Sequence, residues 1–215
     1  MSDYEIQSFE IPLDDLLGVM GKNIKEDIKD FNDLLNLDSS LKREIYLGDV
    51  EIGTGGNIDA YIRFWNSYDD KNNIPIEERQ PIKIYVDSFG GSLTDTFTII
   101  DSIKMSKTPV WAICIGCAYS GGFFSFISAH KRIAYPHASF LFHEGATGTS
   151  GTAAQFENYS QFYRKQLKEL EKIVIENTNI TKEEYKDIKK DDVWYDTKDG
   201  IEKGFIDEIA EGFAS

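Results

Sequence analysis

One serine of this chain occupies a position from which it could act as a nucleophile. Residues 113–127 read ICIGCAYSGGFFSFI, so Ser120 lies where an apolar predicted strand passes through small residues into an apolar predicted helix. A hydroxyl at such a turn is presented to substrate, and the N–H of the following Gly121 points to where an oxyanion would form. The helix N-terminus adds to the preference for an anion. Serine is also a common helix N-cap, which is the alternative role for Ser120.

A serine nucleophile needs a base that accepts its proton, and the three histidines of the chain are the first candidates. His130 and His137 stand in a charged turn and after a proline, respectively, which is typical of solvated surface side chains. His143 follows the apolar run 139–142. We therefore expect its imidazole at a strand end, beside the sheet edge that carries Ser120.

The carboxylate that would orient this imidazole is harder to select, because the chain has 37 acidic residues. Asp191 and Asp192 stand just before Val193 and Trp194, where a carboxylate could be partly buried. An exposed acidic turn explains the same residues, so spacing alone does not choose the third member of a triad.

The two cysteines, Cys114 and Cys117, have the C-x-x-C spacing found in redox pairs and zinc sites. Redox pairs need exposure at a helix start, whereas these two lie within an apolar predicted strand. A zinc site would need further ligands, and the sequence has no second cysteine pair or paired-histidine motif. We expect both thiols to be buried and inert, and we expect no metal or organic cofactor.

Composition narrows the class of protein. A chain of 215 residues with 41% hydrophobic residues can form one well-buried domain. Its formal charge of -14 argues against nucleic acid or an anionic membrane as a partner, because both would be repelled. The opening residues MSDYE lack the features of a secretory signal, and no apolar run is long enough to span a bilayer, so we expect a cytoplasmic protein.

The hydrophobic pattern alternates between strand and helix, which predicts right-handed crossover units on a largely parallel sheet. The predicted strands cover residues 44–47, 82–86, 110–115, 133–135 and 139–142, and the apolar segments at 194–195 and 204–209 close the chain. The predicted helices cover residues 57–65, 93–105, 121–129 and 153–177, and a capping box at 181–184 begins a short one. Residues 69–80 are predicted to form a surface loop, and residues 1–41 a helical arm.

Four motifs in order resemble those of the ClpP-type serine peptidases, proteolytic chambers that work with ATP-driven unfoldases. The segment IYVDSFGG at 84–91 is similar to the family's YINSPGG, and CIGCAYSGG at 114–122 is similar to its CMGQAASMG. FLFH at 140–143 resembles VMIH, and residues 192–207 match the family's DRFLSA-type segment without gaps. The resemblance covers about residues 43–209.

The resemblance implies an α/β fold of the crotonase/ClpP-like β-β-α superhelix type, with a projecting handle helix. It divides the chain into a divergent N-terminal arm, residues 1–41, and a peptidase domain, residues 42–215, whose handle spans about residues 153–190. The helix at 153–177 has an apolar seam and a charged face, so it is expected to project or to pack against a second copy.

Position by position, the resemblance also implies roles for named residues. Ser120 would be the nucleophile, His143 the general base and then acid, and Asp192 the carboxylate that fixes the imidazole tautomer. The backbone N–H groups of Gly91 and Gly121 would form the oxyanion hole.

The same resemblance implies homo-oligomeric rings, as two stacked heptamers, with polypeptide substrates and an AAA+ unfoldase partner. Residues 1–41 bear little likeness to the family's axial pore segment, and the loop at 69–80 is longer, which leaves ATPase docking open. Smaller departures are Phe89 in place of proline and Glu144 with Gly145 in place of Gln-Pro. Two alternatives remain: a non-catalytic ring subunit, and a crotonase-fold acyl-CoA enzyme, which shares the two-amide oxyanion hole.

Overall fold

The computed structural model describes residues 38–212, and the chain divides into two compact units, residues 1–44 and 45–215. In the first unit, residues 38–41 are helical, and Lys42 forms an ion pair of 2.7 Å with Asp38. The helical arm predicted for residues 1–41 therefore lies almost entirely outside the described residues.

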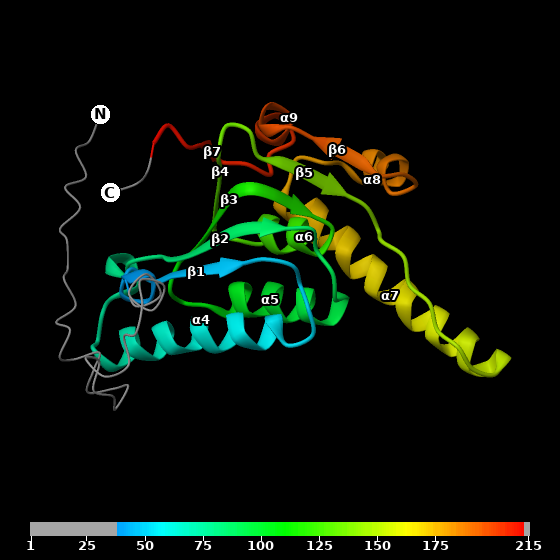
Figure 1. The fold of residues 1–215 in the computed structure, drawn as a ribbon, viewed down its shortest axis with the longest axis horizontal. Helices are drawn as coiled ribbons and strands as arrows, with labels where there is room; N and C mark the ends of the chain where they lie inside the picture. Colours follow the sequence, from blue (N-terminus) through cyan, green and yellow to red (C-terminus); the bar gives the residue numbers. More distant parts are fainter. Residues whose placement is uncertain (1–37, 213–215) are drawn as a thin grey trace, which may run out of the picture. The chain divides into compact units, whose positions relative to one another are not determined.

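A single mostly parallel sheet organises the described part of the chain (Figure 1). Its strands are β1 (Glu44–Leu47), β2 (Ile82–Ser88), β3 (Val110–Tyr119), β4 (Lys131–Ala134), β5 (Ser139–Phe142), β6 (Val193–Tyr195) and β7 (Glu208–Ile209). They follow the order β1-β2-β3-β4-β7, while β5 pairs with β3 and with β6. The ten-residue β3 is shared, because Trp111–Cys114 pair with β4 and Cys117–Tyr119 pair with β5.

Helices cover one face of this sheet. The helical elements are α4 (Thr54–Lys71), α5 (Leu93–Met105), α6 (Gly121–Ile127), α7 (Ala153–Asn177), α8 (Lys182–Ile188), α9 (Thr197–Glu202) and the 3₁₀ turn η1 (Ile76–Glu78). Figure 1 shows α4 and α5 side by side below the strands, and α6 packs on β2 and β3. The strand-helix-strand order and the parallel pairing confirm the predicted α/β class.

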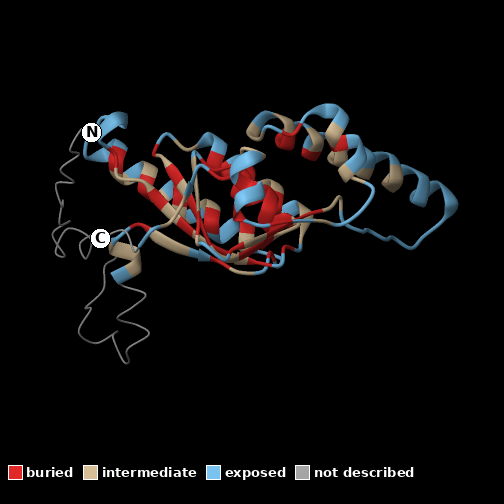
Figure 2. Cartoon of the chain, turned by 90° about the horizontal axis from the view of Figure 1, so that it is seen from above, coloured by how far each residue is buried: buried red, intermediate tan, exposed pale blue. Residues whose placement is uncertain are grey.

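The core lies between these helices and the sheet, as the burial colours in Figure 2 show. Alternate residues of β2 are buried, which is the period-two pattern of a strand with one face against helices. Aromatic rings fill the space around β5 and α6: Phe123, Phe140, Phe142 and Phe205 make edge-to-face contacts with centroids 5.2–6.1 Å apart. Each fully buried ring contributes roughly 1.5–3 kcal/mol through the hydrophobic effect.

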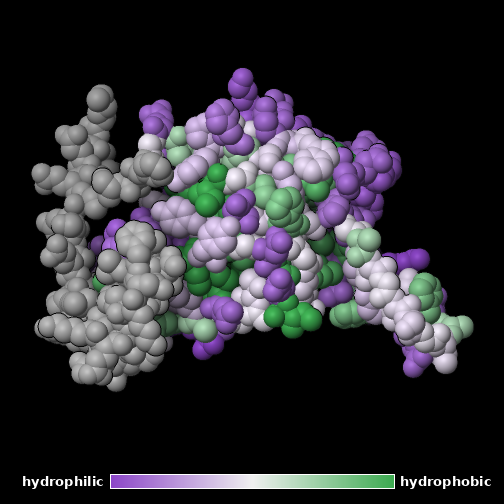
Figure 3. Space-filling model, in the orientation of Figure 1, coloured by the Kyte–Doolittle hydropathy of each residue, from purple (hydrophilic) through white to green (hydrophobic). Residues whose placement is uncertain are grey.

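Helix α7 begins at the predicted residue and projects from the sheet (Figures 1 and 2). Thr152 caps it with a capping box, and its buried residues, Leu170, Ile173 and Val174, all lie toward the C-terminal end. Phe156 and Phe162 in its first half are 56% and 57% exposed. Figure 3 accordingly shows apolar as well as polar surface on the projecting part. The prediction of a projecting helix at 153–177 is confirmed.

The predicted surface loop at 69–80 is wrong in part. Helix α4 continues to Lys71, and Asp69 is 0% exposed. Its buried carboxylate accepts a hydrogen bond of 2.7 Å from the Thr108 hydroxyl. Arg79 is 8% exposed and pairs with Asp70 and Thr108. Polar side chains can be buried when they satisfy one another, so the polar composition of this segment misled the prediction.

Other boundaries differ by a few residues. Strand β4 begins two residues before the prediction and ends one residue earlier, and β3 runs on to Tyr119 rather than ending at 115. Among the described residues, no helix is both long enough and apolar enough to cross a bilayer.

Candidate active site

Ser120 joins β3 to α6 in an unusual backbone conformation. Its φ of 51° and ψ of -119° fall outside the regions that residues with a side chain favour, which costs on the order of 1–3 kcal/mol. Its hydroxyl makes no helix-capping hydrogen bond. The alternative role as a helix cap is therefore wrong, and the strained turn is typical of a serine presented to substrate.

Two glycines from the end of β2 approach this serine. A Cβ atom on Gly90 would lie 2.7 Å from both the Gly121 nitrogen and the Ser120 Cβ, and a Cβ on Gly121 would lie 3.4 Å from the Gly91 nitrogen. Only residues without side chains permit this approach. The backbone N–H groups of Gly91 and Gly121 thus lie close together beside Ser120.

The segment that carries Gly91 is fixed by backbone hydrogen bonds to Val50. The Val50 N–H donates to the Gly90 carbonyl at 2.8 Å, and the Ser92 N–H donates to the Val50 carbonyl at 2.7 Å. Within residues 38–212, the N–H groups of Gly91 and Gly121 have no hydrogen-bond acceptor. Two adjacent unpaired amide donors at a helix N-terminus can stabilise a negative oxygen.

His143 and Asp192 are brought together by the pairing of β5 with β6. These strands are antiparallel, with Phe142 opposite Val193, so the residues one step further, His143 and Asp192, come to face each other. The imidazole Nδ1 lies 3.1 Å from Asp192 Oδ1. The His143 side chain is 29% exposed and that of Asp192 is 61% exposed. The carboxylate can hold the proton on Nδ1 and leave Nε2 free to accept another.

Ser120 lies at the same edge of the sheet as this pair. Tyr119 is opposite Leu141 in the parallel pairing of β3 with β5, and the Ser120 N–H donates to the Leu141 carbonyl at 3.0 Å. Both strands therefore end side by side, with Ser120 after one and His143 two residues after Leu141. In the described part of the chain no hydrogen bond joins the Ser120 hydroxyl to His143. The structure pairs the imidazole with the carboxylate and places the serine at the same edge of the sheet.

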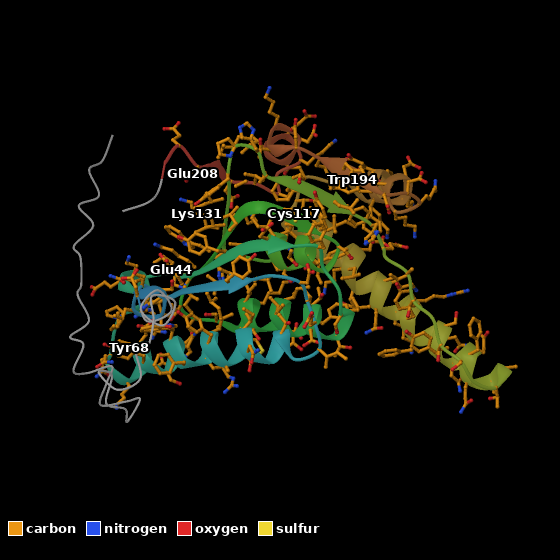
Figure 4. The ribbon with its side chains drawn as sticks, in the orientation of Figure 1. Glu44, Tyr68, Cys117, Lys131, Trp194 and Glu208 are labelled. Atoms are coloured by element: carbon orange, nitrogen blue, oxygen red, sulfur yellow. The ribbon has the colours of Figure 1, made fainter. Side chains whose placement is uncertain are left out.

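Three aromatic side chains line this edge, and two of them are exposed. Phe89, Tyr119 and Trp194 form a row of edge-to-face contacts with ring centroids 5.5 and 5.1 Å apart. Phe89 is 70% exposed and Trp194, labelled in Figure 4, is 58% exposed. Such a row can contact apolar side chains of a polypeptide.

The remaining histidines and the cysteines differ in their surroundings. His137 is exposed as predicted, whereas His130, also exposed, accepts a hydrogen bond of 3.0 Å from the Val110 N–H and anchors the start of β3. Cys114 and Cys117 are 0% and 7% exposed, which confirms that both are buried. Burial raises the pKa of the Cys114 thiol far above its usual range, and burial with the neighbouring Asp87 raises that of Cys117 to about 11.

One group of contacts at the site was not predicted from the sequence. Residues Phe142 and Glu144, on either side of His143, both contact the buried Tyr185. The only signal in the sequence is a single aromatic residue within the charged segment KEEYKDI.

A mostly parallel sheet covered by helices on one face, glycine-lined turns at its carboxyl edge and a projecting α7 define the ClpP-like α/β fold. The sequence model of the family described as Clp protease matches residues 75–212. This chain belongs to the Clp protease family, and the predicted resemblance is confirmed.

The relatives found are proteolytic subunits at modest identity. The ATP-dependent Clp protease proteolytic subunit of Lactococcus lactis subsp. lactis is 32% identical over 169 residues, which cover 76% of this chain and 80% of the relative. Proteolytic subunit 2 from Treponema denticola is 30% identical over 134 residues, covering 61% of this chain and 67% of the relative. Proteolytic subunit 1 from Shouchella clausii is 29% identical over 170 residues, covering 78% of this chain and 84% of the relative. The chain is a divergent ClpP-type member.

Proposed function

We propose that this chain is a serine endopeptidase that cleaves unfolded polypeptides inside an oligomeric chamber. Ser120 is the nucleophile, His143 the general base and then acid, and Asp192 the carboxylate that orients the imidazole. The observation that carries the proposal is the 3.1 Å pair between His143 and Asp192, beside a strained serine and two unpaired amides.

The geometry supports a two-step reaction. As the Ser120 oxygen attacks the peptide carbonyl, its proton passes to His143 Nε2, and the carbonyl oxygen becomes negative beside the N–H groups of Gly91 and Gly121. His143 then donates the proton to the departing amine, and an acyl ester remains on Ser120. A water molecule, deprotonated by His143, hydrolyses this ester and restores the serine. Asp192 keeps the proton on Nδ1 throughout and stabilises the imidazolium.

The alternative is a non-catalytic ring subunit, and two observations favour it. In the described residues the Ser120 hydroxyl has no hydrogen bond to His143, and Asp192 is well exposed. Catalytic hydrogen bonds are often long in a resting site and shorten only when substrate binds. The peptidase proposal therefore requires a movement of the Ser120 or His143 side chain on binding.

The chamber is a second part of the proposal, with residues 42–215 as the peptidase domain, residues 153–190 as its handle and residues 1–41 as a divergent arm. The exposed aromatic residues of α7 support contacts with other copies, and we propose two stacked heptameric rings. The relatives are named ATP-dependent, which supports an ATPase partner.

Charge reversal of Lys165, Lys168 and Lys172 on α7 should reduce the particle mass measured by light scattering. An unchanged mass counts against ring stacking through this helix.

A fluorophosphonate probe tests the peptidase directly, because it reacts with an activated serine, whose oxygen displaces fluoride from phosphorus. We expect the wild-type protein to be labelled, and the Ser120→Ala and His143→Ala variants to remain unlabelled with unchanged particle mass. His137→Ala is the matched control, since His137 is an exposed histidine away from the pair, and it should label normally. An assembled wild-type particle that is neither labelled nor able to cleave a fluorogenic peptide would favour the non-catalytic subunit.

A further inference from the structure

The residues on both sides of His143 are held by one buried side chain. Tyr185 of α8 is 0% exposed. Its ring packs edge-to-face on Phe142, with centroids 5.4 Å apart, and its hydroxyl donates a hydrogen bond of 3.2 Å to Glu144 Oε1. A single tyrosine therefore contacts the side chains of the residues before and after His143.

Glu144 is held by two further groups. Its backbone carbonyl accepts a hydrogen bond of 3.1 Å from the Tyr163 hydroxyl of α7, and Lys189 Nζ lies 3.8 Å from Oε1. The Glu144 side chain is only 20% exposed, so these contacts are partly shielded from water. Burial, followed by the charge of Glu144, raises the pKa of both tyrosines, which keeps their hydroxyls protonated as donors.

These contacts connect the two segments that carry the imidazole and the carboxylate. His143 and Asp192 are 49 residues apart in the chain, and they meet at the end of a three-residue register between β5 and β6. Tyr185 belongs to α8, and Lys189 caps this helix just before the chain reaches Asp192. Glu144 directly follows His143, and its contacts with Tyr185 and Lys189 connect it to the segment that leads into Asp192.

We propose that Glu144 and Tyr185 are positioning residues that hold His143 against Asp192, a role that rests on the proposed peptidase function. Neither side chain acts on substrate. Their hydrogen bond limits the rotation of the strand end on which the imidazole sits, and the contact with Lys189 limits the movement of the carboxylate segment. Small misplacements of a catalytic base are costly, about 10²-fold in rate for roughly 1 Å.

The contacts of Glu144 with Tyr185 and Lys189 are called the clamp below. Three variants test it through the rate of phosphonylation by a fluorophosphonate and through kcat and KM on a fluorogenic peptide. Glu144→Ala should lower both the phosphonylation rate and kcat by roughly 10- to 100-fold, with KM nearly unchanged. Tyr185→Phe should give a loss in the same direction while keeping the ring on Phe142. Glu144→Gln should restore most of the rate, because its amide oxygen can still accept from Tyr185.

The matched control is Tyr159→Phe. The Tyr159 hydroxyl contacts Thr147, four residues beyond His143, and so tethers the same segment to α7 without touching Glu144. We expect a wild-type rate for this variant. An equal loss in Tyr159→Phe, or wild-type rates in both Glu144→Ala and Tyr185→Phe, would overturn the proposal.

A double variant separates alignment from other effects. If Glu144 acts only through the imidazole–carboxylate pair, adding Glu144→Ala to Asp192→Ala should cause little further loss of kcat, whereas multiplied losses of kcat would contradict the clamp.

A crystal structure of Glu144→Ala provides a readout that does not depend on activity. Separation of His143 Nδ1 from Asp192 supports the clamp, and an intact pair overturns it. If the wild-type protein is not labelled, the peptidase proposal fails, while this structure still decides the clamp.

Discussion

Gly90→Ala should disable the site without replacing any of the three proposed triad residues. Gly90 has a φ of +91°, and an added Cβ would lie 2.7 Å from the Gly121 nitrogen, the Ser120 Cβ and the Tyr119 carbonyl oxygen. Ordinary contacts between such atoms are about 3.5–4.0 Å, so the two backbone segments must separate by roughly 1 Å. This movement would take the amides of Gly91 and Gly121 away from a common oxygen.

The expected magnitude follows from that displacement. Loss of one oxyanion donor costs about 10²–10³ in turnover, so kcat should fall by that factor while KM changes little. Stability should fall as well, by about 1–3 kcal/mol from the backbone strain and about 1–3 kcal/mol from the overlap. Peptide hydrolysis measures the loss of turnover, and thermal unfolding measures the loss of stability.

Gly56→Ala is the control for this experiment. Gly56 lies near the start of α4, and a Cβ there would meet nothing within 4 Å. Alanine should leave turnover unchanged and alter stability by no more than about 1 kcal/mol, in the stabilising direction. A folded Gly90→Ala particle with wild-type turnover would refute the inference that the two glycine segments form the oxyanion site.

Three further outcomes are expected. Asp192→Asn should lower kcat by roughly 10²–10⁴, because the amide cannot hold the productive tautomer; turnover within threefold of wild type would exclude the role of the carboxylate. Iodoacetamide at pH 8 should leave Cys114 and Cys117 unmodified in the native protein and alkylate both after unfolding, as mass spectrometry can show, because burial raises both thiol pKa values. Burial would raise the pKa of the Asp207 carboxyl, but its hydrogen bonds to Arg132 outweigh this effect and lower the pKa from its ordinary value of 3.8. The stability that these hydrogen bonds provide is therefore present above pH 3.8 and is lost as the pH falls through the lower pKa of the folded state. Chemical unfolding between pH 5 and 2 should therefore show a shallower decline in Arg132→Gln than in the wild type.

Much of the fold could be predicted because periodicity and caps are local properties of the sequence. The helix at 153–177 has an apolar stripe at helical spacing and begins after Thr152, which caps it in the structure. The helix at 93–105 likewise begins after Ser92, whose hydroxyl accepts from the Asp95 N–H. The prediction for residues 69–80 was wrong because the burial of Asp69 depends on Thr108, which is distant in the sequence.

The candidate site could be predicted only in part. Residue type and strand-end position select Ser120 and His143, but the choice of Asp192 required the resemblance to the family. The approach of Gly90 to Ser120, the positive φ of the serine and the contact between Glu144 and Tyr185 are all tertiary. No spacing rule relates such residues, because they meet only after β2, β5 and α8 have packed.

The central claim is that one serine, one imidazole and two backbone amides surround a single reacting centre. A crystal structure of the fluorophosphonate adduct tests it most directly. The account predicts a phosphonyl group on the Ser120 oxygen, with its P=O oxygen within about 2.7–3.1 Å of both the Gly91 and Gly121 nitrogens and His143 Nε2 beside the serine oxygen. An adduct on another residue, or an oxygen directed away from both amides, would contradict it.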